Sequence, residues 1–209
     1  MDANFEQALA HAMIYEVAAF FDPTDPEVQA GLISTKTQRR KVGYVNDPED
    51  RGGETKFGVA ANANPGVDIA RLTWAQALEV YYQKYWIAGG CHLLPPRVAT
   101  IHLDGCINHG VIRAGKFLQQ IVRVQMDGIV GPGTARAVAA MDEFEVCDRL
   151  AARREEFYHT IVINKPSQSK FLNGWMNRIE GVREYAMRAD APDDTQYASD
   201  EGSSDQQAG

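Results

Sequence analysis

The sequence predicts a mainly α-helical protein with a small β-hairpin lobe, and three observations lead to this fold class. Apolar residues recur at intervals of three and four in several segments, which is the spacing of one face of an amphipathic helix. Residues 43–59 interrupt that pattern with a proline and four glycines, so no helix can run through them. Hydrophobic residues form 44% and charged residues 23% of the 209-residue chain, which are ordinary proportions for a soluble globular protein.

A first helix is predicted from about Phe5 to about Phe21, with Leu9 and Met13 on its apolar stripe. Glu16 lies late in this helix, in line with the stripe. Its position alone leaves two interpretations open. Glu16 is either a surface glutamate at the edge of the stripe or a partly desolvated acid.

Residues 22–41 are predicted as an irregular excursion between this helix and the hairpin. Pro23 and Pro26 stop a helix, and Gly31 loosens the chain. Four basic residues fall between positions 36 and 41. They either lie on a solvated loop or meet an anionic polymer.

Residues 43–59, GYVNDPEDRGGETKFGV, are predicted to fold as a tight hairpin. An Asn-Asp-Pro turn signal at residues 46–48 and the Gly52-Gly53 pair both favour sharp reversals. The segment is either a solvated acidic turn or part of a site that acts on a substrate. Beside Thr55 it carries four carboxyl groups, those of Asp47, Glu49, Asp50 and Glu54.

The remaining helices are predicted from their start and stop signals. A capping box at Thr73 and Gln76 opens an aromatic helix that closes at residues 89–90. A proline pair opens the next helix, which ends near His109. Asp142, with Glu145 three residues later, caps a long helix. Further helices are expected over residues 111–124, after a sharp turn at 126–134 through residue 141, and over residues 169–187.

The charge of the chain is concentrated in its last twenty residues, 190–209. This tail has six acids and no Lys or Arg, and it is predicted to be disordered because it cannot bury a core. Without those six acids the formal charge of −7 becomes −1. A nearly neutral body offers no wide basic surface, which argues against nucleic-acid binding.

The sequence predicts no cofactor, metal site or membrane span. Cys91, Cys106 and Cys147 are widely spaced and odd in number, which favours buried thiols. No apolar run approaches the roughly twenty residues that cross a bilayer, and the N-terminus does not resemble a secretory signal. No phosphate-binding or dinucleotide motif occurs. Three residues of metal-binding type match no common zinc spacing, namely His102, Asp104 and His109.

Several motifs in the same order resemble the N-acetylmuramidases of glycoside hydrolase family 108, which include phage endolysins. They span about residues 5–187. The family pattern is Gly-Gly-Tyr-Val-Asn-Asp-Pro, continuing into Asp-x-Gly-Gly-x-Thr-x-x-Gly-Ile, and residues 43–59 supply nearly all of it. Later similarities are the tyrosine-tryptophan helix at 80–86, LDGCINHG at 103–110, the Leu118-Gln119 pair, DGIVGPGT at 127–134 and FLNGWMNRI at 171–179.

This resemblance implies a lysozyme-like helical domain over residues 1–124, a helical peptidoglycan-binding region over 125–189, and the acidic tail. The family's glutamate before the hairpin is replaced here by Lys41 and Val42. Glu16 can take its place only if residues 17–41 are an insertion. Removing them gives the order Glu16, Asp50, Thr55, which is similar to that of phage-type lysozymes.

The roles expected from this order follow glycosidase chemistry. Glu16, among apolar neighbours, would protonate the leaving oxygen, Asp50 would be the second carboxylate, and Thr55 would position water. Glu54 and Glu49 are the fallback acids. The expected substrate-binding residues are Tyr44, Asp47, Glu54, Asp104 and Asn108.

The expected function is hydrolysis of the β-1,4 bond between N-acetylmuramic acid and N-acetylglucosamine. Two alternatives stay open: a non-catalytic peptidoglycan-binding protein, and a lytic transglycosylase. The expected partner is the peptidoglycan glycan strand, bound by a monomer. An endolysin would be made in the host cytoplasm, released with a phage holin, and act in the periplasm.

Overall fold

The computed structural model describes residues 2–17, 21–47 and 53–188. Over these residues the protein is mainly helical with one two-stranded antiparallel sheet, which confirms the predicted fold class. The expected acidic tail, and with it the prediction of disorder, lies outside the described residues. The main elements are α1 (Ala3–Glu16), α2 (Pro26–Gln29), α3 (Lys36–Lys41), β1 (Thr55–Lys56), β2 (Val59–Ala60), α4 (Trp74–Tyr81), α5 (Pro96–His109), α6 (Val111–Ile121), α7 (Pro132–Ala139), α8 (Glu143–Asn164) and α9 (Ser169–Met187).

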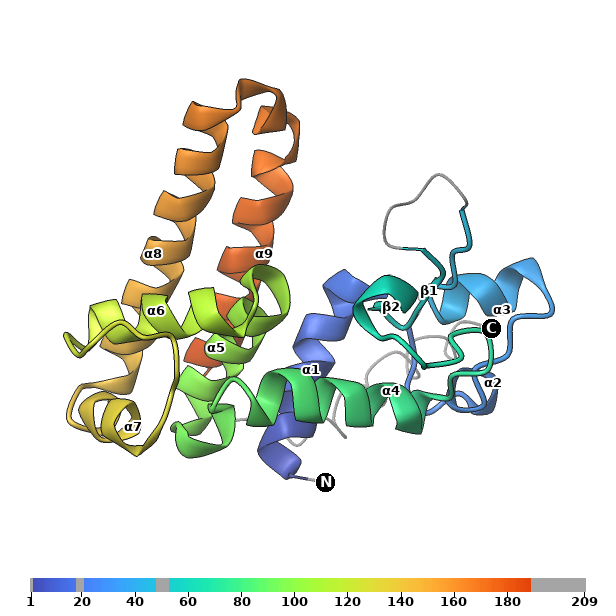
Figure 1. Cartoon of the computed structure of the whole chain (residues 1–209), viewed down its shortest axis with the longest axis horizontal. Helices are drawn as coiled ribbons and strands as arrows, with labels where there is room; N and C mark the ends of the chain where they lie inside the picture. The colour runs from blue at the N-terminus through green and yellow to red at the C-terminus, as the bar shows by residue number, and fades with distance from the viewer. Residues whose placement is uncertain (1, 18–20, 48–52, 189–209) are drawn as a thin grey trace, which may run out of the picture.

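Helix α1 lies between two groups of elements (Figure 1). On one side are α5, α6, α7 and the long antiparallel pair α8 and α9; on the other are α2, α3, α4 and the β1–β2 hairpin. Helix α5 contacts α1, α6, α8 and α9, so it is the centre of the first group. This arrangement brings the C-terminal end of α1 close to both groups.

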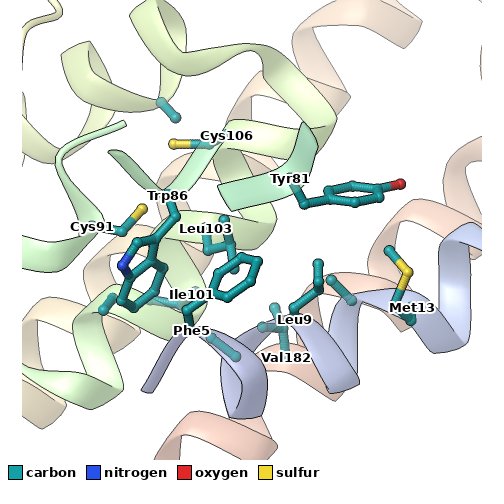
Figure 2. Packing of buried hydrophobic residues seen from close by; sticks show 14 of the residues in the cluster. Phe5, Leu9, Met13, Tyr81, Trp86, Cys91, Ile101, Leu103, Cys106 and Val182 are labelled. Carbon is teal, nitrogen blue, oxygen red and sulfur yellow. The ribbon is translucent and has the colours of Figure 1, made fainter. Parts of the chain in front are cut away.

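The core forms where α1 meets α5. Figure 2 shows Phe5 and Leu9 of α1 near Ile101 and Leu103 of α5, with Trp86 beside Phe5. All five side chains are at most 1% exposed. Burying side chains of this size contributes about 1.5–3 kcal/mol each, so this contact fixes α1 on α5.

Helix α1 ends at Glu16, about five residues before the predicted end near Phe21. The N–H of Val17 still bonds to the Met13 carbonyl, but the chain at residue 43 then packs against Val17. A Cβ at Gly43 would lie 3.0 Å from the Val17 carbonyl oxygen. The end of α1 therefore coincides with a contact to a distant segment, and the local apolar pattern of the helix does not predict such a contact.

The segment predicted as an irregular excursion contains two short helices, α2 and α3. Thr35 and Gln38 form a capping box that starts α3, so part of the basic cluster is helical. Lys41 donates to Asp25 at 2.6 Å and to Glu27 at 2.9 Å. These pairs hold α3 against α2.

The hairpin is present, with Lys56 opposite Val59. Its two-residue turn is Phe57-Gly58, and both residues have positive φ, 53° and 73°. Positive φ at both positions matches the type I′ turn that joins twisted antiparallel strands. The sharp reversal was expected at Gly52-Gly53; Gly53 also has positive φ, and residues 48–52 lie outside the described part.

Most later helices have the predicted limits. The Thr73–Gln76 capping box, the Asp142 cap and the span of α9 are confirmed. The aromatic helix changes at Tyr82 into a π-helical turn, η2 (Tyr82–Ile87), and a 3₁₀ turn, η3 (Cys91–Leu93), precedes α5. Within the described ranges no helix is long and apolar enough to cross a membrane.

The DGIVGPGT turn at residues 127–134 is held on α6 by a buried amide. Gln119 donates to Asp127 at 2.7 Å and accepts from the Gly128 N–H at 2.7 Å. The backbone of Gly128 also approaches Gly115 of α6, where a Cβ would lie 2.4 Å from the Gly128 carbonyl oxygen. This turn therefore requires glycine at position 115.

Replacing Gly115 by Ala should lower the free energy of unfolding by about 1–3 kcal/mol, because the added methyl group meets backbone atoms. The matched control is Gly174→Ala in α9, where nothing lies within 4 Å of the added Cβ. There the better helix propensity of Ala should stabilise the protein by up to about 1 kcal/mol. Urea unfolding measures both, and equal stabilisation by the two variants would contradict the packing described here.

Candidate active site

Glu16 lies where the end of α1 meets the hairpin turn. A Cβ at Gly58 would lie 3.4 Å from Glu16 Oε2 and 2.4 Å from the Tyr81 hydroxyl oxygen, so these three groups adjoin. The Tyr81 hydroxyl donates to the Phe57 carbonyl at 2.9 Å and fixes the turn. The Glu16 side chain is 22% exposed, so solvent and a substrate can reach it. The structure thus brings Glu16 to the hairpin although Glu16 and Phe57 are forty-one positions apart in the sequence.

The other oxygen of Glu16 is held by an arginine from the far end of the chain. Arg178 of α9 donates to Glu16 Oε1 at 2.8 Å and also contacts Asp104 Oδ1 of α5 at 2.8 Å. Arg154 of α8 donates to the second oxygen of Asp104 and, through Nε, to His109 at 3.2 Å. This series of contacts, the ion chain, joins α1, α5, α8 and α9.

The ion chain contains two carboxylates and two guanidinium groups, so its formal charges cancel when both acids are ionised. Burial alone would raise the pKa of Asp104, but Arg154 and Arg178 hold it below its ordinary value. Burial, with a contribution from Arg154, lowers the pKa of His109 to about 3. His109 is therefore neutral and accepts the hydrogen bond from Arg154 through Nε2.

Two tyrosines border Glu16 on the α4 side. Burial, followed by the nearby charge of Glu16, raises the pKa of both Tyr81 and Tyr85. Their hydroxyl groups therefore stay protonated around neutral pH. The rings of the two tyrosines lie 5.6 Å apart. Together they form an aromatic surface beside the Glu16 carboxyl group, the tyrosine wall.

The predicted hairpin residues fall in different places. The Tyr44 hydroxyl donates to the Glu54 carboxylate at 2.6 Å, which raises the pKa of Tyr44. The Thr55 hydroxyl donates to the Gly53 carbonyl at 3.2 Å and keeps its oxygen lone pairs for another donor. Asp47 is exposed. Asp50 and Glu49 lie outside the described residues.

Asp104 has a structural position, which corrects the prediction that it binds substrate. Its side chain is 1% exposed and both oxygens face arginines, so a glycan has no surface of Asp104 to contact. Asn108, one turn later, lies near the Asp104 carboxylate at 3.4 Å and is partly exposed. Of this predicted pair, Asn108 is the residue that a substrate can approach.

Sequence reasoning missed the two arginines. Arg154 lies four residues after Leu150 and four before Tyr158, on the buried face of α8. An arginine on an apolar stripe indicates a buried ion pair, because a buried charge needs a partner. Arg178 lies within FLNGWMNRI, a motif already noted, but its partners are 74 and 162 positions away.

Comparison with known proteins gives two family matches and several similar solved structures. Residues 35–110 match the family described as glycosyl hydrolase 108, and residues 113–180 match a predicted peptidoglycan domain. The structure is similar to that of SagA from Brucella abortus, at 26% sequence identity and a TM-score of 0.64, over 87% of this chain and 92% of that chain. No curated protein matches. Glu16 precedes both family matches, whereas Arg178 lies in the second.

Replacing Asp104 by Asn should lower the free energy of unfolding by about 3–5 kcal/mol, because it leaves buried guanidinium charge without its counterion. The matched control is Asp148→Asn on α8, where the exposed pair with Arg183 should contribute less than about 1 kcal/mol. Chemical denaturation compares the two variants. A similar small effect at both sites would show that the ion chain contributes little to stability.

Stability should fall as the pH drops from about 6.5 towards 3, because His109 has a pKa of about 3 in the folded protein and about 6.5 when unfolded. The unfolded chain binds the extra proton in this window, and acidification therefore favours it. Replacing His109 by Gln, which keeps an acceptor for Arg154, should flatten the dependence of Tm on pH between 6.5 and 4.5. The exposed His92→Gln variant serves as control, and an unchanged slope in the His109 variant would contradict the assignment.

Proposed function

We propose that the protein cleaves the β-1,4 bond between N-acetylmuramic acid and N-acetylglucosamine, with Glu16 as general acid. The chain carries a glycosyl hydrolase 108 region joined to a peptidoglycan domain, which supports a peptidoglycan hydrolase. The observation that carries this proposal is the position of Glu16. It is the partly exposed carboxyl group at the junction of α1, the hairpin turn and the tyrosine wall.

The geometry around Glu16 suits proton donation to a leaving oxygen. Arg178 orients the carboxyl group through Oε1, and Oε2 lies close to Gly58 of the hairpin turn. Arg178 is shared with Asp104, so its charge does not act on Glu16 alone.

Glycoside hydrolysis also needs a second carboxylate and a water molecule. We assign these roles to Asp50 and Thr55 from their order in the sequence. Thr55 lies on β1, three residues before Gly58, and its hydroxyl oxygen can accept a hydrogen bond from water. Attack by water gives a product with a reducing N-acetylmuramic acid end. A lytic transglycosylase would give the 1,6-anhydro product.

Replacing Glu16 by Gln should reduce digestion of purified peptidoglycan by about 10²–10⁴-fold, because the leaving oxygen loses its proton donor. The same change at Glu180, an exposed residue of α9, should leave the rate within about twofold, since surface ion pairs contribute little. Glu54→Gln should keep most of the activity, because the Glu54 carboxylate accepts a hydrogen bond from Tyr44 within the hairpin, and the amide oxygen of the introduced glutamine can still accept it.

Turbidity loss of cell-wall suspensions gives the rates, and mass spectrometry of the digest identifies the products. Normal digestion by the Glu16 variant would exclude Glu16 as the acid, and a selective loss in the Glu54 variant would transfer the role. Anhydro products from the unmodified protein would replace the hydrolase assignment by a lytic transglycosylase.

A further inference from the structure

Three side chains with soft metal-binding atoms meet in the core next to η2. Cys91 lies in η3, and His102 and Cys106 are one turn apart on α5. Each of the three residues is at most 1% exposed. Their donor atoms all lie within 4.8 Å of one another. Figure 2 shows the two cysteines beside Trp86, on separate elements. Chain folding, and not a short sequence motif, therefore assembles the cluster.

The distance between Cys106 and His102 is compatible with tetrahedral zinc. With Zn–S of about 2.3 Å and Zn–N of about 2.0 Å, two donors of a tetrahedral site lie about 3.6 Å apart. Cys106 Sγ and His102 Nε2 are 3.5 Å apart. A thiol–imidazole hydrogen bond has a similar length, so this distance alone does not separate the two states.

The ring nitrogen of His102 that faces the cluster is Nε2. It lies 3.0 Å from the Gly89 carbonyl oxygen and 3.5 Å from Cys106 Sγ. Nε2 is therefore the atom through which His102 would coordinate a metal ion.

The backbone at Gly89 leaves room for the two sulfur atoms. A Cβ there would lie 2.8 Å from Cys106 Sγ and 3.4 Å from Cys91 Sγ. The Gly89 carbonyl oxygen is the hydrogen-bond partner of His102 Nε2 and would supply a fourth ligand atom. Two thiolates neutralise the charge of a divalent cation, so the whole group can be buried.

We propose that Cys91, His102 and Cys106 bind one Zn²⁺ ion, with the Gly89 carbonyl oxygen as the fourth donor. The site is structural and not catalytic, because the side chains of Cys91, His102 and Cys106 are all buried. It ties η3 to α5 and thereby fixes the preceding η2 turn, which contains Tyr85 of the wall beside Glu16. The sequence spacing does not indicate this site, since Cys91 and His102 are eleven positions apart.

The test uses the full-length protein without an affinity tag, purified under reducing conditions. Elemental analysis should find about one zinc per chain, and Co²⁺ substitution should give the visible bands of tetrahedral cobalt–thiolate coordination. Cys91→Ala and Cys106→Ala should each lower the zinc affinity by at least about tenfold and abolish those bands. Cys147→Ala is the matched control, because Cys147 is equally buried on α8 but lies outside the cluster.

Three results would overturn the proposal. The first is no stoichiometric zinc or cobalt after refolding of the reduced protein with metal. The second is equal metal binding by the Cys91, Cys106 and Cys147 variants. The third is a Cys91–Cys106 disulfide, seen as a single free thiol per denatured chain. None of these readouts depends on glycosidase activity, so the proposed function is tested separately.

Discussion

The ion chain from Glu16 through Arg178 and Asp104 to Arg154 is the interaction on which the site depends. Isolated buried charges are too costly to persist, so each member requires the next. Asp104 is 1% exposed and Arg154 2% exposed, and between them they join α5 to α8. Arg178 adds α9 and then α1. The position of Glu16 therefore depends on three other helices.

The ion chain also joins the two regions that known families match. The hairpin turn belongs to the glycosyl hydrolase 108 match, and Arg178 belongs to the peptidoglycan domain match. Glu16 precedes both and contacts both, through Gly58 on one side and Arg178 on the other. The second region therefore helps to hold Glu16, the candidate acid, through Arg178.

Local signals predicted much of the fold, because helix caps act over three or four residues. The capping box at Thr73 and the cap at Asp142 are both present as expected. The predicted end of α1 is wrong: the helix ends at Glu16, where Val17 packs against Gly43, a contact between distant segments that the local pattern does not contain. For the same reason Asp104 was assigned to substrate: a carboxylate in a polar motif gives no sign of arginines fifty and seventy-four positions later.

The two carboxylates that share Arg178, those of Asp104 and Glu16, differ in their hydrogen bonds and in their exposure to solvent. Asp104 has both oxygens bonded and is only 1% exposed, so its charge serves to hold the arginines. Glu16 has one oxygen bonded to Arg178, the other lies near Gly58, and its side chain is 22% exposed. The proposed proton donor must be held firmly and still be accessible. Glu16 can be both held and partly exposed because Asp104 takes the buried position between the two arginines.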